Sequence, residues 1–277
     1  MLIKQHNATS QTAIAAGLFV VLLAGLVFEP ATAQNTAAEE KGFDIAARSD
    51  RSDLGFASSE VDAIMTLTNA AGKTSTREMY FKTLEKVNEQ VGDRSLTVFE
   101  TPRDVQGTAL LSHAKILTAD DQWLYLPALK RVKRISSANK SGPFVGSEFA
   151  FEDLTSTELN KYGYKFVGEE TFDGMTVDVV ERTPLYSNSG YIRQVSYVDQ
   201  EIFQVRKVDF YDRKNSLLKT LTLSNFKEYE GGIWRAQLFT MNNHQTGKST
   251  SLAYGDYKFK TGLAERDFVK GVLKRIR

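Results

Sequence analysis

Beyond residue 60, the hydrophobic positions fall into short runs rich in Val, Ile, Thr, Phe and Tyr, with turn residues between them. β-Branched and aromatic side chains fit the pleated surface of a sheet, and runs of this length between turns are typical of antiparallel strands. The pattern predicts strands over residues 61–68, 75–91, 94–101, 109–118, 122–126, 132–136, 164–169, 175–182, 191–198, 202–211, 217–228, 233–242 and 249–258.

Tight turns join many of these runs. Asp173-Gly174 lies between two apolar runs and predicts a two-residue hairpin turn, because both residues tolerate a positive φ. Gly231-Gly232 indicates a similar turn further along the chain. Successive hairpins form a meander, and little helix is left to cover both faces of a parallel sheet. We therefore expect a mainly β fold, either a strongly curved antiparallel sheet or an open barrel.

Three segments have apolar spacing that is compatible with helix: residues 42–59, 148–162 and 264–275. In a curved sheet, we expect such segments to cap the concave side. The alternation within the strands does not assign one face to the core, since Phe239 lies on one face of its strand and Trp234 on the other. A sheet between a core and covering helices explains this pattern, and so does a sheet that lines an apolar ligand cavity.

The first 33 residues have the pattern of a secretory signal. Lys4 supplies a positive charge, residues 13–27 are apolar, and Ala31-Thr32-Ala33 supplies small residues for a cleavage site. An uncleaved anchor helix is the alternative, but this apolar stretch is shorter than the roughly 20 residues that span a bilayer. We predict a signal peptide over residues 1–33 with cleavage after Ala33, a lead-in and N-terminal helix over 34–59, and a single domain over 60–277.

The chain contains no cysteine, which excludes disulfides, thiol nucleophiles and thiolate metal sites. A bacterial lipoprotein signal ends at a cysteine that becomes the acylated first residue, and Gln34 occupies that position here. We therefore predict an exported protein that is soluble in the periplasm. The net charge of +1 also argues against a nucleic-acid partner, because proteins that follow the phosphate backbone normally carry a clear basic excess.

Few residues point to catalysis. Beyond the signal segment only His113 and His244 remain, and neither has a carboxylate at zinc-motif spacing. The sequence has no Gly-x-Ser-x-Gly nucleophile elbow, Walker loop or dinucleotide-binding fingerprint. The pairs Asp120-Asp121 and Glu169-Glu170 are more simply explained as exposed turn carboxylates. We predict no catalytic residue, no metal site and no cofactor, and therefore no enzyme.

The most distinctive stretch is central. It comprises Gly107-Thr108-Ala109-Leu110-Leu111, the run Asp120-Asp121-Gln122-Trp123-Leu124-Tyr125-Leu126-Pro127-Ala128-Leu129-Lys130-Arg131-Val132-Lys133-Arg134-Ile135, and Phe149-Ala150-Phe151-Glu152-Asp153-Leu154. Phe210-Tyr211-Asp212 and Met241-Asn242-Asn243-His244-Gln245-Thr246-Gly247 follow in order. Together these motifs resemble the outer-membrane lipoprotein-sorting protein family, the LolA-like periplasmic proteins, in the branch associated with exporters of the resistance–nodulation–division superfamily.

The resemblance implies an incompletely closed antiparallel β-barrel whose apolar concave face is lidded by helices and accommodates acyl chains. The expected ligands are lipid or lipoprotein acyl chains, and the candidate partners are a resistance–nodulation–division exporter or an outer-membrane acceptor. We select seven aromatic ligand-cavity candidates, for each of which a place in the core is the alternative: Trp123, Tyr125, Phe149, Phe151, Tyr191, Trp234 and Phe239. The lid candidates are Phe43, Leu54 and Phe56 near the N-terminus, and Phe149, Phe151 and Leu154 centrally.

A basic quartet, Lys130, Arg131, Lys133 and Arg134, follows the central motif. It is a candidate patch for anionic headgroups or for an acidic partner, and a solvated strand edge that resists aggregation is the alternative. The sequence thus supports two functions. One is a soluble periplasmic carrier or chaperone that binds lipid or lipoprotein acyl chains in an apolar cavity. The other is an accessory protein that docks on a membrane exporter through the quartet without carrying lipid.

Overall fold

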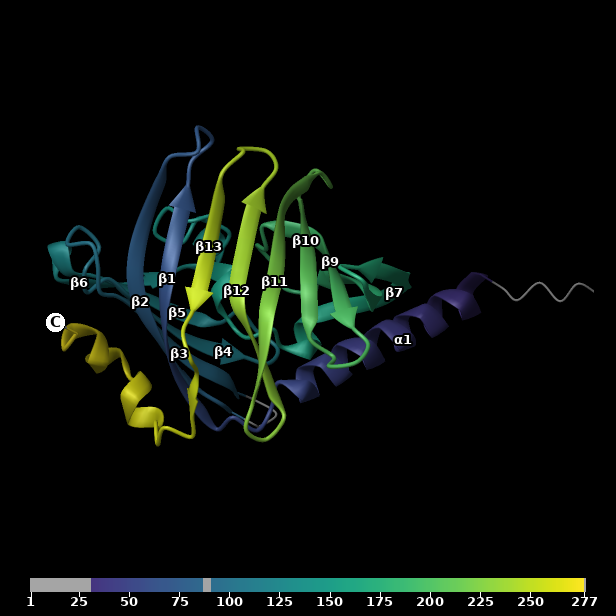
Figure 1. Cartoon of the computed structure of the whole chain (residues 1–277), viewed down its shortest axis with the longest axis horizontal. Coiled ribbons are helices and arrows are strands. Elements are labelled where there is room, and N and C mark those ends of the chain that lie inside the picture. The colour runs from purple at the N-terminus through teal and green to yellow at the C-terminus, as the bar shows by residue number, and fades with distance from the viewer. Residues whose placement is uncertain (1–30, 87–90, 277) are drawn as a thin grey trace, which may run out of the picture.

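A computed structural model describes residues 31–86 and 91–276 of the chain (Figure 1). These residues form one α-helix, α1 (Ala31–Ser52), several 3₁₀ turns and one large antiparallel sheet. The strands are β1 (Ser58–Thr68), β2 (Thr74–Leu84), β3 (Val91–Phe99), β4 (Ala109–Lys115), β5 (Asp121–Leu126), β6 (Arg131–Ile135), β7 (Tyr162–Phe172), β8 (Met175–Pro184), β9 (Tyr191–Asp199), β10 (Val205–Asp212), β11 (Leu217–Tyr229), β12 (Ile233–Asn243), β13 (Ser249–Tyr254) and β14 (Lys258–Phe259).

Most neighbours in the sheet are also neighbours in the chain, as a meander requires. The order is β6-β5-β4-β3-β2-β1-β13-β12-β11-β10-β9-β8-β7, with β14 paired to β1. The pairing of β1 with β13, which places Met65 opposite Leu252, joins the two halves of the meander. Strands β6 and β7 lie at opposite edges and do not pair with each other in the described sheet. The structure therefore confirms a mainly β fold with an incompletely closed antiparallel sheet.

The predicted hairpin turn at residues 173–174 joins β7 to β8. Asp173 has a φ of 50° and Gly174 a φ of 79°, and Phe172 pairs with Met175 across the turn. Two positive φ angles match the right-handed twist of the flanking strands, which explains why this dipeptide was a reliable signal. The predicted strand over 75–91 is divided, since β2 ends at Leu84 and β3 begins at Val91.

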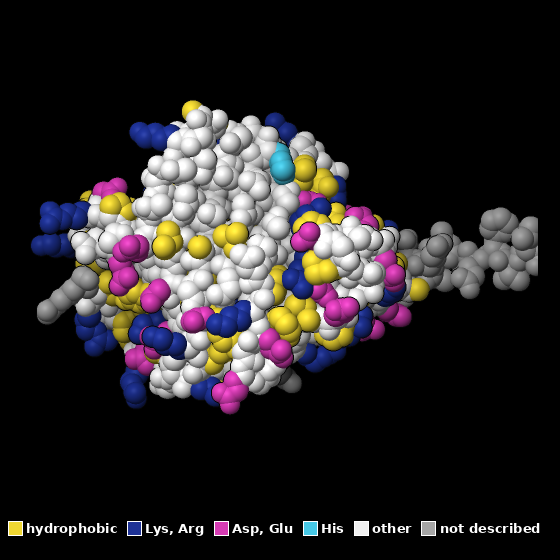
Figure 2. All heavy atoms as spheres, viewed as in Figure 1, with side chains coloured by type: hydrophobic (Ala, Val, Ile, Leu, Met, Phe, Trp, Pro, Cys, Tyr) yellow, Lys and Arg dark blue, Asp and Glu magenta, His cyan; other side chains and the backbone are white. Residues whose placement is uncertain are grey.

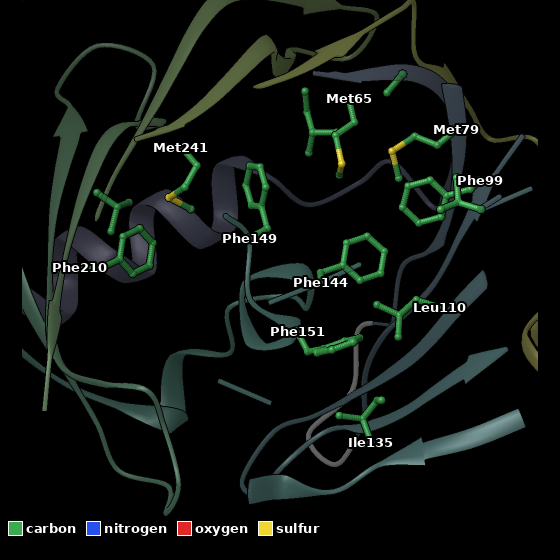
Figure 3. Close-up of a cluster of buried hydrophobic side chains, with 14 of the residues drawn as sticks. Met65, Met79, Phe99, Leu110, Ile135, Phe144, Phe149, Phe151, Phe210 and Met241 are labelled. Atoms are coloured by element: carbon green, nitrogen blue, oxygen red, sulfur yellow. The ribbon is translucent and has the colours of Figure 1, made fainter. Parts of the chain in front are cut away.

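The segment between β6 and β7, residues 136–161, fills the middle of the concave face and is here called the central segment. It contains the 3₁₀ turns η2 (Ser137–Asn139), η3 (Phe151–Leu154) and η4 (Leu159–Lys161) instead of the α-helix expected over 148–162. Phe144 is completely buried and stacks on Phe99 at 5.5 Å between ring centroids. Figure 3 shows Phe144, Phe149 and Phe151 in one cluster with side chains from both halves of the sheet.

Helix α1 packs on the same face of the sheet, against β7 and β8. Ile45 is buried with Tyr164, Val180 and Val198. At Gly42 the helix touches the backbone of β7, because a Cβ there would lie 2.7 Å from the amide nitrogen of Phe166. Only glycine allows this close approach. The helix and the central segment thus cover the concave face, as expected from the sequence.

The C-terminal segment lies on the opposite, convex face. Its 3₁₀ turns, η5 (Glu265–Phe268) and η6 (Lys270–Lys274), place Phe268 and Leu273 against Leu96, Leu111 and Trp123 of β3, β4 and β5. Our expectation that residues 264–275 cap the concave side is therefore wrong. The reason is that β3, β4 and β5 are apolar on both faces, so that their convex side needs a cover of its own.

Among the described residues, no helix combines the length and the apolar character that a membrane crossing requires. The predicted signal peptide falls largely on residues 1–30, outside the described residues. Its cleavage after Ala33 and the domain boundaries stay predictions.

Candidate functional site

A cavity of about 190 Å³ lies on the concave face, between the central segment and the strands β8 to β11. One wall is apolar and comes from β10 and β11. Alternate residues of a strand share a face, so Val208 and Phe210 of β10, and Leu221 and Leu223 of β11, point to the same side. Val205 completes this wall.

The opposite end of the cavity is polar. It is built by Arg182 and Gln194 of β8 and β9, by Tyr162 of β7, and by Tyr186 of the β8–β9 loop. The Arg182 Nε donates to Gln194 Oε1 at 2.6 Å, and the guanidinium lies 5.0 Å from the centre of the Tyr162 ring. Burial raises the pKa of Tyr162 and of Tyr186 above the ordinary tyrosine value, so both phenols stay neutral hydrogen-bonding groups at neutral pH.

The Glu152 carboxylate lines the same polar end and is held by three donors. Glu152 Oε1 accepts from the amide of Gly190 at 2.8 Å, while Oε2 accepts from the hydroxyls of Ser189 at 2.9 Å and Tyr186 at 3.2 Å. Its pKa is raised by burial, although these hydrogen bonds oppose the shift. The contacts attach the central segment to the β8–β9 loop beside the cavity.

A buried ion pair fixes the central segment to β11. Lys219 Nζ donates to Asp153 Oδ2 at 2.6 Å and to the carbonyl oxygen of Glu148 at 2.9 Å. The side chains of Lys219 and Asp153 are only 4% and 6% exposed. The Tyr191 hydroxyl donates to the other oxygen of Asp153 at 2.8 Å. A buried pair whose remaining oxygens are hydrogen-bonded specifies one position for the segment.

Contacts to the other side of the sheet complete this attachment. Gln122 Nε2 of β5 donates to the carbonyl oxygen of Phe151 at 2.9 Å, and Arg77 of β2 donates to the carbonyl oxygen of Val145 at 2.6 Å. Lys161 forms an ion pair with Asp120 next to the cavity. The central segment therefore spans the concave face and is tied to strands on both sides of it.

Carboxylates gather where helix α1 ends near β3 and the central segment. Desolvation raises the pKa of Glu158 to about 7 and that of Asp93 to about 6, and each is raised further by neighbouring carboxylates. Asp93 Oδ2 accepts a hydrogen bond from Ser156 at 3.1 Å. Protonation of this group of acids is thus linked to the contact between the central segment and β3.

The structure divides the seven aromatic ligand-cavity candidates between two faces. Phe149, Phe151 and Tyr191 belong to the buried cluster of the concave face, and Phe239 packs at its margin, 5.0 Å from Tyr254 between ring centroids. Trp123 and Tyr125 lie on the convex face under the C-terminal segment. Trp234 is half-buried and alternates with Phe239 on its strand. None of the seven lines the described cavity, and their part in ligand binding stays a prediction.

The lid candidates also differ in their positions. Phe43 and Leu54 are 43% and 44% exposed, whereas Phe56 is buried just after the helix. Leu154 packs at the margin of the concave cluster, in which Phe149 and Phe151 are buried. Sequence reasoning missed Arg182 and Leu223 as site residues. For Leu223 the alternation of its strand carried a usable signal, whereas the position of Arg182 at a predicted strand end carried none.

The basic quartet lies at a free edge of the sheet. Arg131, Lys133 and Arg134 are exposed on β6, which is an edge strand, and Lys130 precedes it in a left-handed conformation with a φ of 49°. Arg134 is paired with Asp121 of the neighbouring strand. Figure 2 shows Lys and Arg side chains gathered at the left end of this view, where Figure 1 places β6. Both interpretations of the quartet are compatible with this position.

The two histidines contact the protein itself. His113 Nε2 lies 2.7 Å from the carbonyl oxygen of Phe268, and desolvation lowers the pKa of His113. His244 Nε2 lies 2.8 Å from the hydroxyl of Thr220. Within residues 31–86 and 91–276, no three His, Cys, Asp or Glu side chains are grouped so that they could hold a metal ion.

The chain matches one family model and is similar to several solved structures. A family model with the description "Uncharacterized protein" matches residues 92–275. The solved structure of a domain named for outer membrane lipoprotein sorting, from Vibrio parahaemolyticus, is 53% identical with a TM-score of 0.83, and the match covers 86% of this chain and 100% of that one. No curated protein matches the sequence.

Two further solved structures are similar over most of their length. A DUF1329 family protein from Desulfovibrio piger is 30% identical with a TM-score of 0.80, over 85% of this chain and 99% of that one. A LolA superfamily protein from Nitrosomonas europaea is 22% identical with a TM-score of 0.66, over 83% of this chain and 97% of that one, and shows a common fold.

Proposed function

The chain belongs to the family that includes the lipoprotein-sorting domain of Vibrio parahaemolyticus and the DUF1329 protein of Desulfovibrio piger, and we propose that it is a periplasmic carrier of acyl chains. In this proposal the signal segment is removed after Ala33, and the folded chain takes up lipid or lipoprotein acyl chains on its concave face. The observation that carries the proposal is the cavity beside β10 and β11, with its apolar wall and polar end.

The size of the cavity suits partial burial of a chain. Its volume of about 190 Å³ is below the roughly 300 to 1,000 Å³ of typical small-molecule pockets. Each buried methylene contributes about 0.8 kcal/mol, so six of them contribute about 5 kcal/mol, which corresponds to an affinity that still allows exchange. A carrier must release its cargo, and a cavity that holds only part of a chain meets this need without a separate release step.

Movement at the concave face would enlarge the site. Helix α1 contributes a small cluster around Ile45, whereas the central segment is held by the Lys219–Asp153 pair. The apolar contacts of the helix include Val205, which also belongs to the cavity wall, and its ion pairs, Lys41–Glu169 at 3.7 Å and Arg48–Asp178 at 4.0 Å, are longer than the Lys219–Asp153 pair. We therefore assign the moving part to α1 and the fixed part to the central segment.

The direct test is native mass spectrometry of the protein purified from the periplasm, together with titration of a fluorescent long-chain fatty acid. Leu223→Trp fills the cavity from its apolar wall, and we expect at least a tenfold loss of fatty-acid affinity. The matched control is Thr222→Trp, which adds the same side chain on the other face of β11. Equal affinities for the two variants, or wild-type protein without bound lipid and without fatty-acid affinity, would contradict the proposal.

The alternative role, docking on a membrane exporter without lipid, has its own readout. If it holds, the purified protein is empty and associates with exporter-containing membranes through Lys130, Arg131, Lys133 and Arg134. The exposed position of these side chains, on the edge strand β6 and just before it, makes them accessible to such a partner.

A further inference from the structure

We infer that the polar end of the cavity binds the anionic headgroup of the cargo, and that Arg182 is the residue that selects it. The inference rests on the proposed carrier function, since it assigns a second part of the ligand to the same cavity. A cavity with an apolar wall and, at its polar end, an arginine without a carboxylate partner complements an amphiphile with one acyl chain in the cavity and a phosphate or carboxylate at its head.

Arg182 is the lining cation whose charge is least compensated. Lys161 is paired with Asp120, and Lys140 donates to the carbonyl oxygen of Asp120. The ion pairs of the described residues do not include Arg182. Its one hydrogen bond to the described residues uses Nε and a neutral acceptor, Gln194, which leaves both Nη atoms of this cavity-lining residue for a ligand. A guanidinium stays protonated at all physiological pH values and binds carboxylate and phosphate through paired N–H donors.

The surroundings hold the guanidinium in place for such a contact. The Tyr162 ring lies 5.0 Å from it, and Gln194 fixes the Nε edge. Glu152 lines the same end, but its two oxygens already accept hydrogen bonds from Gly190, Ser189 and Tyr186. Thr157 and Ser187 also line the cavity and carry hydroxyl groups that can donate to a headgroup.

The neighbouring strand provides a contrasting arginine. Arg193 of β9 points to the other face, because it alternates with Gln194. Its guanidinium donates to Glu181 at 3.1 Å and stacks on Tyr211. Two arginines on paired strands thus differ in one respect that matters here: the one on the convex face has a carboxylate partner, and the one in the cavity has not.

The test compares three probes of similar chain length: palmitate, palmitoyl lysophosphatidic acid and the neutral monopalmitoylglycerol. We expect wild-type protein to bind the anionic probes more tightly than the neutral one. Arg182→Gln should lower the affinity for the anionic probes by about tenfold to a hundredfold, because it removes a charge-assisted hydrogen bond. Monopalmitoylglycerol should change by less than about twofold, because it makes no such contact. Arg193→Gln should leave all three affinities unchanged, and Arg182→Lys should retain part of the preference.

The outcomes separate headgroup recognition from the carrier function. If Arg182→Gln weakens the binding of palmitate alone or of the lysophospholipid alone, the result supports the inference and identifies the headgroup. If it weakens the binding of both, the result supports recognition of the negative charge that they share. Unchanged anionic affinity in Arg182→Gln overturns the inference while the carrier function stands. Equal loss of neutral and anionic probes, in a variant whose thermal melt is that of wild type, overturns it as well. Absence of binding of all three probes to wild-type protein overturns both proposals.

Discussion

Strands β3 to β6 form one arm of the sheet and β8 to β11 form the other. The faces of the two arms are covered in different ways. The first arm is packed on its concave face by the central segment and on its convex face by the C-terminal segment. The second has a cavity on its concave face, while its convex face carries ion pairs such as Arg193–Glu181 and Lys207–Asp209. The difference indicates separate roles: the first arm is packed on both faces, whereas the second leaves part of its apolar surface unfilled at the cavity.

The largest effect is expected from the contact that joins the central segment to the second arm. Lys219→Met leaves the buried Asp153 carboxylate without its partner, and we expect a loss of about 3 to 5 kcal/mol in the free energy of unfolding, measured by urea denaturation. The control Lys214→Met removes an exposed lysine from the β10–β11 turn and should change stability by less than about 0.5 kcal/mol. A loss below about 1 kcal/mol for Lys219→Met would show that the pair does not fix the segment. Adding Asp153→Leu should recover part of the loss.

A smaller loss, with a different functional result, is expected in the first arm. Trp123→Ala opens a void under Phe268 and Leu273 and should cost about 3 kcal/mol. Because this residue lies on the convex face, the fatty-acid affinity of the folded protein should stay at the wild-type value. Denaturation and fatty-acid titration of the same sample test both statements. A weaker affinity without unfolding would mean that the two arms are coupled, against the division of roles described above.

The pH dependence of stability provides a third comparison. Burial raises the pKa of Glu158 to about 7 and that of Asp93 to about 6, so the folded chain retains protons that the unfolded chain releases in this range. The contribution of these acids to the free energy of unfolding is therefore present at pH 5 and falls as the pH rises through 7. Glu158→Gln should reduce the difference between melting temperatures at pH 5 and pH 7.5. Glu169→Gln, on the exposed part of β7, should leave it unchanged, and equal effects of the two substitutions would contradict the assignment.

The smallest effect on stability, below about 0.5 kcal/mol, is expected at the edge of the first arm. Replacing Lys130 and Lys133 by Glu keeps the edge charged, so protection against strand-to-strand association remains. If the basic quartet contacts headgroups, the same change should weaken sedimentation with vesicles of phosphatidylcholine and phosphatidylglycerol, by about 1 kcal/mol for each charge removed. Lys73→Glu with Lys248→Glu, at exposed turns elsewhere, is the matched control. Unchanged sedimentation would leave edge protection as the role of the quartet.

The strands could be predicted from the sequence because alternation and turn residues act locally. The Asp173-Gly174 turn and the run around Trp123 to Leu126 illustrate this. The faces could not be predicted in the same way. Trp123 and Leu124 are both apolar and pack on opposite faces, and the cover over Trp123 is the C-terminal segment, which lies far away in the chain.

The candidate site was less predictable than the strands for a related reason. Asp153 and Lys219 are 66 residues apart, and nothing near either one marks it as the partner of the other. Likewise, Arg182 differs from Arg193 only in its partners across the sheet. Aromatic residues drew attention because cores and cavities use the same residue types, and the core contains several of them.

The pairing of β1 with β13 also limits how early the sheet can be completed during folding. These strands lie near the two ends of the predicted domain, and Met65 meets Leu252 only after nearly the whole chain is available. Pairing of such distant segments carries a large loop-closure cost, so we expect slow folding that finishes late. Until β13 arrives, β1 and β12 expose edges that can join those of other chains. A chain of this topology that crosses a membrane unfolded therefore depends on reaching its last strands before it meets another copy of itself.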